Sequence, residues 1–241
     1  MALETNLLAY WKLNESSGDA TDSVGGLVLT NNNTVAYSTG KLNNGIDLGS
    51  SNTNKYMNIA NTLGVDGGAF TMNFWVNITT APGSGIVYGL VGQYNSSSKV
   101  SQRLYYHNSS GTLKVYFNLL IAGIANHGID YTYTLTTGTW YMLSYTYNGT
   151  TVTGYINGSS IGTDTGSGSG SDSGYYNGIL VGVVTNNTPP VNPASAKIDE
   201  VSFWSRGLST TEIAQLYNQG NGMTYANGVL TAIVGNNFLQ F

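Results

Sequence analysis

The stretch TWYMLSYTYNGTTVTGYINGSSIGT, residues 139–163, decides the fold of this chain. Two Asn-Gly pairs, Asn148-Gly149 and Asn157-Gly158, each lie between runs in which apolar and polar residues alternate. Asn-Gly in a two-residue loop favours the type I′ turn of a β-hairpin, because both central residues need a positive φ. The stretch therefore predicts three consecutive antiparallel strands.

The first turn sets the register of the first two predicted strands. With a two-residue loop, the apolar side pairs Tyr147 with Thr150, Tyr145 with Val152, Leu143 with Gly154 and Tyr141 with Ile156. The other side pairs Thr146 with Thr151, Ser144 with Thr153 and Met142 with Tyr155. The second turn returns Ile161 to the apolar side, opposite Gly154. One buried face and one partly wet face are typical of an antiparallel sheet in a β-sandwich.

Similar short runs occur along the rest of the chain, separated by clusters of turn residues. The clearest is FTMNFWVNI, residues 70–78, which alternates apolar and mostly polar positions as a strand does. Trp75 lies on its polar side, where it either stacks on a ligand or is covered by a neighbouring strand or loop. Such a succession of short strands predicts an all-β domain.

One short helix is predicted after the strand at residues 197–204. Ser209 and Glu212 have the spacing of a capping box, and Leu208 and Ile213 have the spacing of a hydrophobic staple. The residues after Ile213 continue an apolar stripe at helical spacing. We expect a helix to begin at Ser209.

The composition limits the possible partners. The 241 residues include no cysteine, and 12 acidic against 8 basic residues give a net charge of −4. Disulfides and thiolate metal sites are therefore excluded. The few basic residues form no cluster in the sequence, which argues against nucleic acid as a partner. No run reaches the ~18 apolar residues of a membrane helix, so we predict no membrane insertion. Residues 1–10 also lack the features of a secretory signal. We interpret the chain as a mature or recombinant form, or as one that is exported inside a virus particle.

The chain reads as one domain followed by a tail. The Gly- and Ser-rich segment 162–174 is expected to be a surface loop, because the strands on both sides of it belong to one pattern. We assign residues 1–222 to the sandwich. The apolar tail, residues 223–241, either adds a strand to the sandwich or contacts another subunit.

Four segments, in this order, resemble the laminin-G-like, concanavalin A-like jelly-roll family. They are LLAYWKLNESSGDATDSVGG at 7–26, FTMNFWVN at 70–77, the stretch 139–163, and KIDEVSFWSRGLSTTEIAQLYNQG at 197–220. The resemblance implies an all-β, antiparallel two-sheet jelly-roll sandwich with one short C-terminal helix. It leaves the function open, because the family includes carbohydrate-binding modules, adhesion domains, virion components and spacer domains.

The resemblance also implies one structural calcium ion, which relatives often hold where the opening and closing strands meet. Asp199 matches the closing-strand position, and Glu15, Asp19 and Asp22 lie in the opening turns. Carboxylates and loop carbonyls are the ligands that Ca²⁺ prefers. The alternative is that Asp199 and the adjacent Glu200 accept hydrogen bonds from loop amides or face the solvent.

A glycan site would need aromatic platforms beside amide, hydroxyl or cationic donors on an exposed face. One candidate set lies on the predicted strands around residues 87–108: Tyr94, Arg103, Tyr105, His107 and Asn108. The alternative is that these tyrosines pack as ordinary, half-buried strand residues.

Catalysis is not predicted. Glycoside hydrolases place two carboxylates on either side of the scissile bond, and catalytic relatives of this fold carry a Glu-x-Asp-x-x-Glu signature that this chain lacks. Glu212 is already used by the capping box. The two histidines, His107 and His127, are far apart in the sequence and show no nucleophile or metal signature.

We interpret the chain as a non-catalytic, surface-exposed structural or decorating protein of a virus particle or extracellular assembly. Its partners would be other copies or other structural proteins, contacted through the tail, and cell-surface glycans of a host. The first alternative is a carbohydrate-binding adhesion module of a secreted bacterial protein. The second is a divergent glycoside hydrolase. The expected location is the virion surface or the extracellular space.

Overall fold

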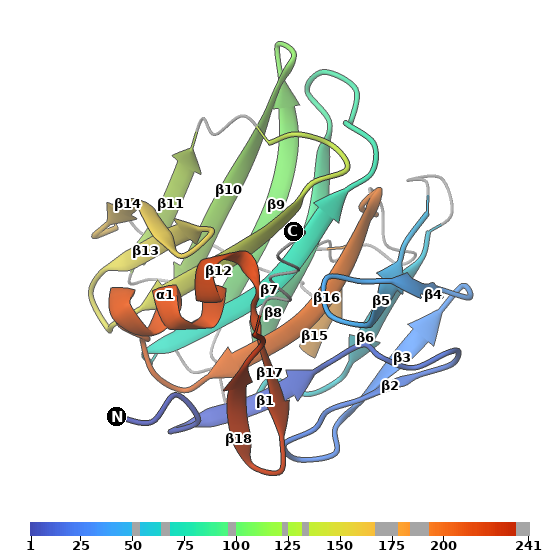
Figure 1. Cartoon of the computed structure of the whole chain (residues 1–241). Coiled ribbons are helices and arrows are strands. Elements are labelled where there is room, and N and C mark those ends of the chain that lie inside the picture. Colours follow the sequence, from blue (N-terminus) through green and yellow to red (C-terminus); the bar gives the residue numbers. More distant parts are fainter. Residues whose placement is uncertain are drawn as a thin grey trace, which may run out of the picture.

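Two antiparallel β-sheets pack face to face and enclose one large core, as Figure 1 shows. The computed structural model describes residues 1–49, 54–63, 68–95, 100–121, 125–131, 135–166, 178–183 and 193–234. The expected all-β jelly-roll sandwich with one short C-terminal helix is confirmed. No helix among the described residues is long and apolar enough to cross a membrane.

The first sheet has the strand order β14-β13-β12-β7-β16-β5-β4, and β1 pairs with β16 beside this path. Its strands are β1 (Leu7–Trp11), β4 (Ala36–Thr39), β5 (Asn44–Asp47), β7 (Phe70–Ile78), β12 (Trp140–Tyr147), β13 (Val152–Ile156), β14 (Ser159–Asp164) and β16 (Ala196–Trp204).

The second sheet has the strand order β11-β10-β9-β8-β15-β6-β3-β2. Its strands are β2 (Ala20–Thr21), β3 (Val28–Asn32), β6 (Tyr56–Ile59), β8 (Val87–Asn95), β9 (Val100–Ser109), β10 (Thr112–Ile121), β11 (Ala125–Tyr131) and β15 (Gly178–Val181). Much of the expected loop at 162–174 lies outside the described residues.

The first Asn-Gly turn differs from its prediction by two residues. Asn148 has no positive φ, and its Oδ1 accepts hydrogen bonds from the backbone N–H groups of Thr150 and Thr151 at 3.0 and 2.9 Å. The loop is therefore four residues long, and Tyr147 lies opposite Val152 instead of Thr150. Because a shift of two keeps every side chain on its face, the predicted apolar side still lies in the core.

The second Asn-Gly turn is confirmed. Asn157 and Gly158 have φ values of 51° and 78°, and Ile156 pairs with Ser159, so the loop has two residues. Ile161 does pack against the main core, as expected. However, a bulge in β14 places Gly162 opposite Gly154, where Ile161 was predicted.

The outer face of the first sheet is buried in part, while Thr153 on this face is half-exposed and lines a groove, in agreement with the predicted partly wet face. Met142 and Tyr155 pack there beneath the helix α1 (Thr210–Tyr217), in a cluster with Ile213 and Leu216. Trp75 also lies under this layer, only 2% exposed, with its ring stacked on that of Tyr217 at 5.8 Å. Of the two predicted roles for Trp75, the structure therefore shows the packed one.

A row of buried polar side chains crosses three strands on this same face. The Ser144 hydroxyl donates to Oδ1 of Asn73 at 2.7 Å, and the amide of Asn73 donates to Oγ of Ser202 at 3.5 Å. These three residues lie on β12, β7 and β16. The row satisfies polar groups that would otherwise be buried without partners.

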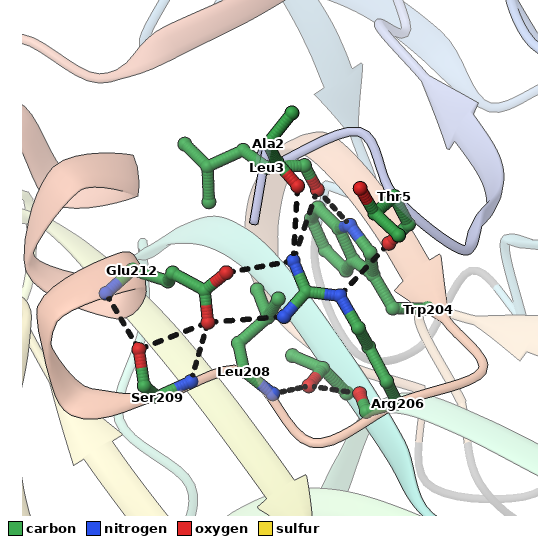
Figure 2. Close-up of polar contacts among 9 residues, drawn as sticks. Ala2, Leu3, Thr5, Trp204, Arg206, Leu208, Ser209 and Glu212 are labelled. Atoms are coloured by element: carbon green, nitrogen blue, oxygen red, sulfur yellow. Dashed lines mark hydrogen bonds and ion pairs between the residues drawn. The ribbon is translucent and has the colours of Figure 1, made fainter.

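The helix α1 begins where the sequence predicts. The Ser209 Oγ accepts from the Glu212 N–H at 3.3 Å, and Glu212 Oε2 accepts from the Ser209 N–H at 2.8 Å, which completes the capping box. Arg206 joins this box by an ion pair to Glu212 at 2.8 Å (Figure 2). Its hydrogen bonds with Arg206 and Ser209 lower the pKa of Glu212 to about 2.

Arg206 also holds the beginning of the described chain against the closing strand. Its guanidinium donates to the carbonyl oxygens of Thr5 at 2.8 Å and Ala2 at 3.3 Å, and the Trp204 indole donates to the Leu3 carbonyl at 2.8 Å (Figure 2). These bonds connect residues that are about 200 positions apart in the sequence.

Replacing Ser209 by alanine removes the side-chain half of the capping box. We expect Ser209→Ala to lower the free energy of unfolding by about 1 kcal/mol, which is roughly 2–4 °C in Tm for a domain of this size. Thermal unfolding followed by circular dichroism measures this change. Thr211→Ala, at an exposed position in the same turn, is the control and should stay within about 0.5 kcal/mol of the parent.

The first half of the apolar tail folds back on the sandwich. The strands β17 (Met223–Ala226) and β18 (Val229–Ala232) form a hairpin that is a separate two-stranded sheet. Leu230 is buried in the cluster that contains Tyr10 and Trp204, and the Tyr10 hydroxyl donates to the Met223 carbonyl at 2.8 Å. Residues 235–241 lie outside the described residues.

Candidate functional site

The candidate glycan residues of β9 lie on the outer face of the second sheet. Arg103, Tyr105 and His107 alternate with Leu104 and Tyr106, which point into the core. All three outward residues are half-buried. The alternation of a strand therefore brings a cation, a phenol ring and an imidazole onto one face.

β10 supplies partners for two of them. Tyr116 lies opposite Tyr105, and their rings stack with centroids 4.8 Å apart and planes at 27°. Asn118 lies opposite Arg103, and its Oδ1 accepts from Nε and Nη2 of the guanidinium at 3.2 and 2.8 Å. We call these four residues the aromatic–guanidinium patch.

The other two predicted residues have structural positions. Tyr94 is only 1% exposed and packs with Leu180 and Val183. The Asn108 side chain braces the turn after β9, because it donates to the Pro82 carbonyl at 2.9 Å and accepts from the Gly111 N–H at 2.8 Å. The structure therefore brings together Arg103, Tyr105 and His107. The register also keeps Tyr94 on this outer face, diagonal to Arg103 but buried, whereas the Asn108 side chain is used by the turn.

Tyr116 and Asn118 were missed by the sequence reasoning. The signal that would have found them is the Ser110-Gly111 pair, whose φ values of 53° and 88° make a two-residue hairpin turn. Ser-Gly is a turn signal, and counting back from such a turn places Tyr116 opposite Tyr105.

The opening-turn carboxylates accept hydrogen bonds from backbone amides. Asp22 accepts from the N–H groups of Tyr10, Val24 and Gly25 at 2.5, 2.9 and 2.6 Å, so both of its oxygens are engaged. Asp19 accepts from Asn31 at 2.8 Å, and Glu15 Oε1 accepts from Thr21 at 3.0 Å. These bonds hold the turns that follow β1.

Asp199 and Glu200 form a buried acidic pair at a bulge in β16. Asp199 Oδ2 accepts from the N–H groups of Lys41 and Leu42, both at 2.8 Å. The other Asp199 oxygen and both Glu200 oxygens accept no hydrogen bond from residues that the structure describes. Burial raises the pKa of Asp199 to about 8, and burial together with the Asp199 charge raises the pKa of Glu200 well above its usual range.

The fit of a calcium ion is mixed. Two buried carboxylate oxygens that lack a partner within the described chain, Asp199 Oδ1 and Glu15 Oε2, are suitable ligands. Both carboxylate oxygens of Asp22 already accept hydrogen bonds from backbone amides. The described residues also contain no group of three carboxylates or histidines close enough to hold a metal. Calcium therefore stays a prediction, with Asp199 and Glu15 as the residues that would hold it.

A family model for the concanavalin A-like lectin/glucanases superfamily matches residues 50–214, which is more than half of the chain. The chain belongs to this superfamily. The match covers β6 through the first part of α1, including the stretch 139–163 and the closing strand β16. A search of curated proteins by sequence found no match.

Solved structures with the same superfamily architecture include several binding domains. The binding domain of Paraclostridial mosquitocidal protein 1 has a TM-score of 0.66 at 17% identity, and covers 90% of this chain and 53% of its own. The binding domain of botulinum neurotoxin DC in complex with SialylT has a TM-score of 0.65 at 15% identity, and covers 90% and 52%. The chain thus spans about half the length of these toxin domains.

Another similar structure comes from a glycosidase. Domain 4 of an extracellular arabinanase from Geobacillus stearothermophilus, in complex with arabinotriose, has a TM-score of 0.59 at 16% identity, and covers 87% of this chain and 97% of its own. At these identities the similarity shows the superfamily fold alone. The similar chains are mainly binding domains, and some belong to glycosidases.

Proposed function

We propose that this chain is a non-catalytic glycan-binding module whose ligand contacts the aromatic–guanidinium patch on β9 and β10. The observation that carries the proposal is the stacked pair of Tyr105 and Tyr116 next to the Arg103–Asn118 contact, on the outer face of a rigid sheet. Two similar structures support it, since domain 4 of the arabinanase is a complex with arabinotriose and the neurotoxin DC domain is a complex with SialylT.

The chemistry of the patch favours an oligosaccharide with an acidic sugar. Aromatic rings contribute a flat apolar surface against which the carbon face of a sugar ring can pack. Arg103 supplies a positive charge next to the rings, with its Nε and Nη2 donating to Asn118, and Lys114 lies opposite His107 on the same face. Two of the eight basic residues of the chain, Arg103 and Lys114, thus lie on this face.

Replacing Tyr105 by alanine tests the platform. We expect Tyr105→Ala to weaken the binding of the best ligand from a glycan array by about fivefold or more, because a stacked ring is worth ~1 kcal/mol. Isothermal titration measures the change. Tyr225→Ala is the matched control, because it also removes a stacked ring, which lies 5.8 Å from that of Tyr10, but on the hairpin β17–β18. The affinity of this variant for the glycan should equal that of the parent chain.

Charge selectivity provides the second part of this test. Arg103→Gln should weaken acidic glycans more than neutral ones. An array on which no glycan binds at high protein concentration would reject the module's glycan-binding role, and equal losses for Tyr105→Ala and Tyr225→Ala would move the site away from the patch.

The absence of catalysis is part of the proposal. Two grooves next to α1 each contain one carboxylate, Glu4 in one and Glu212 in the other, and Glu212 is held by Arg206. A glycosidase needs two carboxylates across one bond. Hydrolysis of any substrate in a polysaccharide panel by the purified chain would overturn this part of the proposal.

A role as a structural or decorating component of a virion or another extracellular assembly is the second proposal. It is supported by exposed apolar side chains near the end of the described chain, with Val229 and Val234 exposed by 52% and 86%. Because the hairpin β17–β18 packs on the sandwich, the test keeps the hairpin and replaces the two exposed side chains together, by Val229→Ser and Val234→Ser. Loss of self-association in sedimentation velocity would support an assembly role, and identical sedimentation of the variant and the parent chain would reject it.

A further inference from the structure

A cavity of about 260 Å³ lies at one end of the sandwich, between the two sheets. Phe70 and Phe203 approach it from the first sheet, and Gln93 and Gln102 approach it from the second. Leu8 and Leu63 add aliphatic walls. Most of the lining side chains are apolar, but the two amides and Ser205 contribute a comparable share of the cavity surface.

The two glutamines occupy core positions. They lie opposite each other on β8 and β9, on the same face as Val91 and Leu104, and each is 1% exposed. The next two residues on this face of β9, Leu104 and Tyr106, are both core side chains. The strand pattern thus breaks its apolar alternation at the cavity.

The two amides differ in the contacts that the described residues make with them. The amide nitrogen of Gln93 donates to the Thr62 carbonyl. Oε1 of Gln102 is buried and accepts no hydrogen bond from any residue that the structure describes. A buried polar atom without a partner costs about 1–3 kcal/mol, so an acceptor in this place favours a donor that the described residues do not supply.

The size of the cavity exceeds what a single water molecule needs. A water molecule takes up about 30 Å³ of liquid volume, and an engineered apolar cavity of about 150 Å³ binds benzene. A cavity of about 260 Å³ can therefore hold a single substituted ring. A sugar fits less well, because a ring with several hydroxyls would need more polar partners than the two glutamines provide.

We propose that this cavity is a binding site for a small aromatic alcohol, whose ring packs against Phe70 and Phe203 and whose hydroxyl donates to Oε1 of Gln102. The site is separate from the aromatic–guanidinium patch, since Gln102 and Arg103 point to opposite faces of β9. Its ligand class is set by the Gln102 acceptor next to two phenyl rings, which favours a compact aromatic molecule with a donor group.

The experiment uses p-cresol and p-xylene, which have the same shape but differ by the hydroxyl. Each is titrated into the ¹⁵N-labelled chain, and the backbone amide shifts of Ala69, Phe70 and Gln102 are followed. We expect p-cresol to bind about fivefold more tightly than p-xylene, the usual worth of one hydrogen bond. In Gln102→Met, which keeps the length but removes the acceptor, p-xylene should still bind and the preference for p-cresol should disappear.

Binding of p-xylene to Gln102→Met shows that the variant is folded with its cavity intact. The absence of shifts with either compound would mean a cavity that holds only water and would overturn the proposal. Equal affinity for both compounds in the parent chain, or a preference for p-cresol that survives in Gln102→Met, would also overturn it. So would shifts that map to Arg103 and Tyr116 in place of Ala69 and Phe70.

Discussion

Phe117→Ala should lower the free energy of unfolding by about 3–5 kcal/mol, the usual cost of removing a buried aromatic ring. Phe117 on β10 is fully buried, and its ring lies 5.6 Å from that of Tyr145 across the sandwich. It also faces Gly154, where an added Cβ would lie 3.2 Å from the Phe117 ring. The ring therefore fills the space that the first hairpin leaves above its glycine.

Chemical denaturation measures this loss, which corresponds to roughly 6–20 °C in Tm for a domain of this size. Lys114→Ala is the matched control, because Lys114 lies on the other, half-exposed face of the same strand. It should change stability by less than about 0.5 kcal/mol. A loss below about 1 kcal/mol for Phe117→Ala would mean that β10 and the stretch 139–163 do not share one core.

Glu200→Gln should stabilise the protein at pH 8 and have little effect at pH 5. In metal-free buffer we expect a gain of about 1–3 kcal/mol at pH 8, since a neutral amide replaces a carboxyl whose charged form is disfavoured by burial and by the Asp199 charge. The gain corresponds to roughly 2–12 °C in Tm. Thermal unfolding between pH 4 and pH 9 measures it, with Glu4→Gln as the control for loss of one carboxyl.

The sign follows from the raised pKa values of the acidic pair. Below about pH 4, the carboxyl of Asp199 is protonated in both the folded and the unfolded chain. Between about pH 4 and the folded pKa of about 8, the unfolded chain releases this proton and the folded chain retains it, so stability falls as the pH rises. Glu200 has the same sign, because its pKa is also raised.

Calcium would reverse this result. If Asp199 holds the ion, millimolar Ca²⁺ should raise the Tm of the parent chain at pH 8, and EDTA should remove the increase. A parent chain whose Tm does not respond to either reagent would reject the calcium prediction. A parent chain that is more stable at pH 8 than at pH 5 in metal-free buffer would contradict the burial of the acidic pair.

The sequence predicted the faces of the strands better than their alignment. Tyr141, Leu143, Tyr145 and Tyr147 all lie in the core, because the apolar period of two requires only that the strand be extended with one side buried. Register depends on the turn, and the side chain of Asn148 widened this turn by two residues through bonds to Thr150 and Thr151. A dipeptide pattern does not contain that information.

The candidate site was predicted in part for the same reason. Alternation along one strand places Arg103, Tyr105 and His107 together, whereas Tyr116 and Asn118 come from the neighbouring strand and depend on its register. The burial of Tyr94 depends on Leu180 and Val183, which are more than 80 positions away in the sequence. Packing between such distant residues has no local signal.

The buried row of Ser144, Asn73 and Ser202 solves an ambiguity that apolar packing leaves open. A shift of one strand by two residues relative to its neighbour keeps every apolar side chain in the core, so the hydrophobic effect alone does not select one register. The same shift would break the hydrogen bonds of the Ser144 and Ser202 hydroxyls and the Asn73 amide. Each buried polar group left without a partner would lower the free energy of unfolding by about 1–3 kcal/mol. The row therefore selects the one register in which all three polar side chains are hydrogen-bonded.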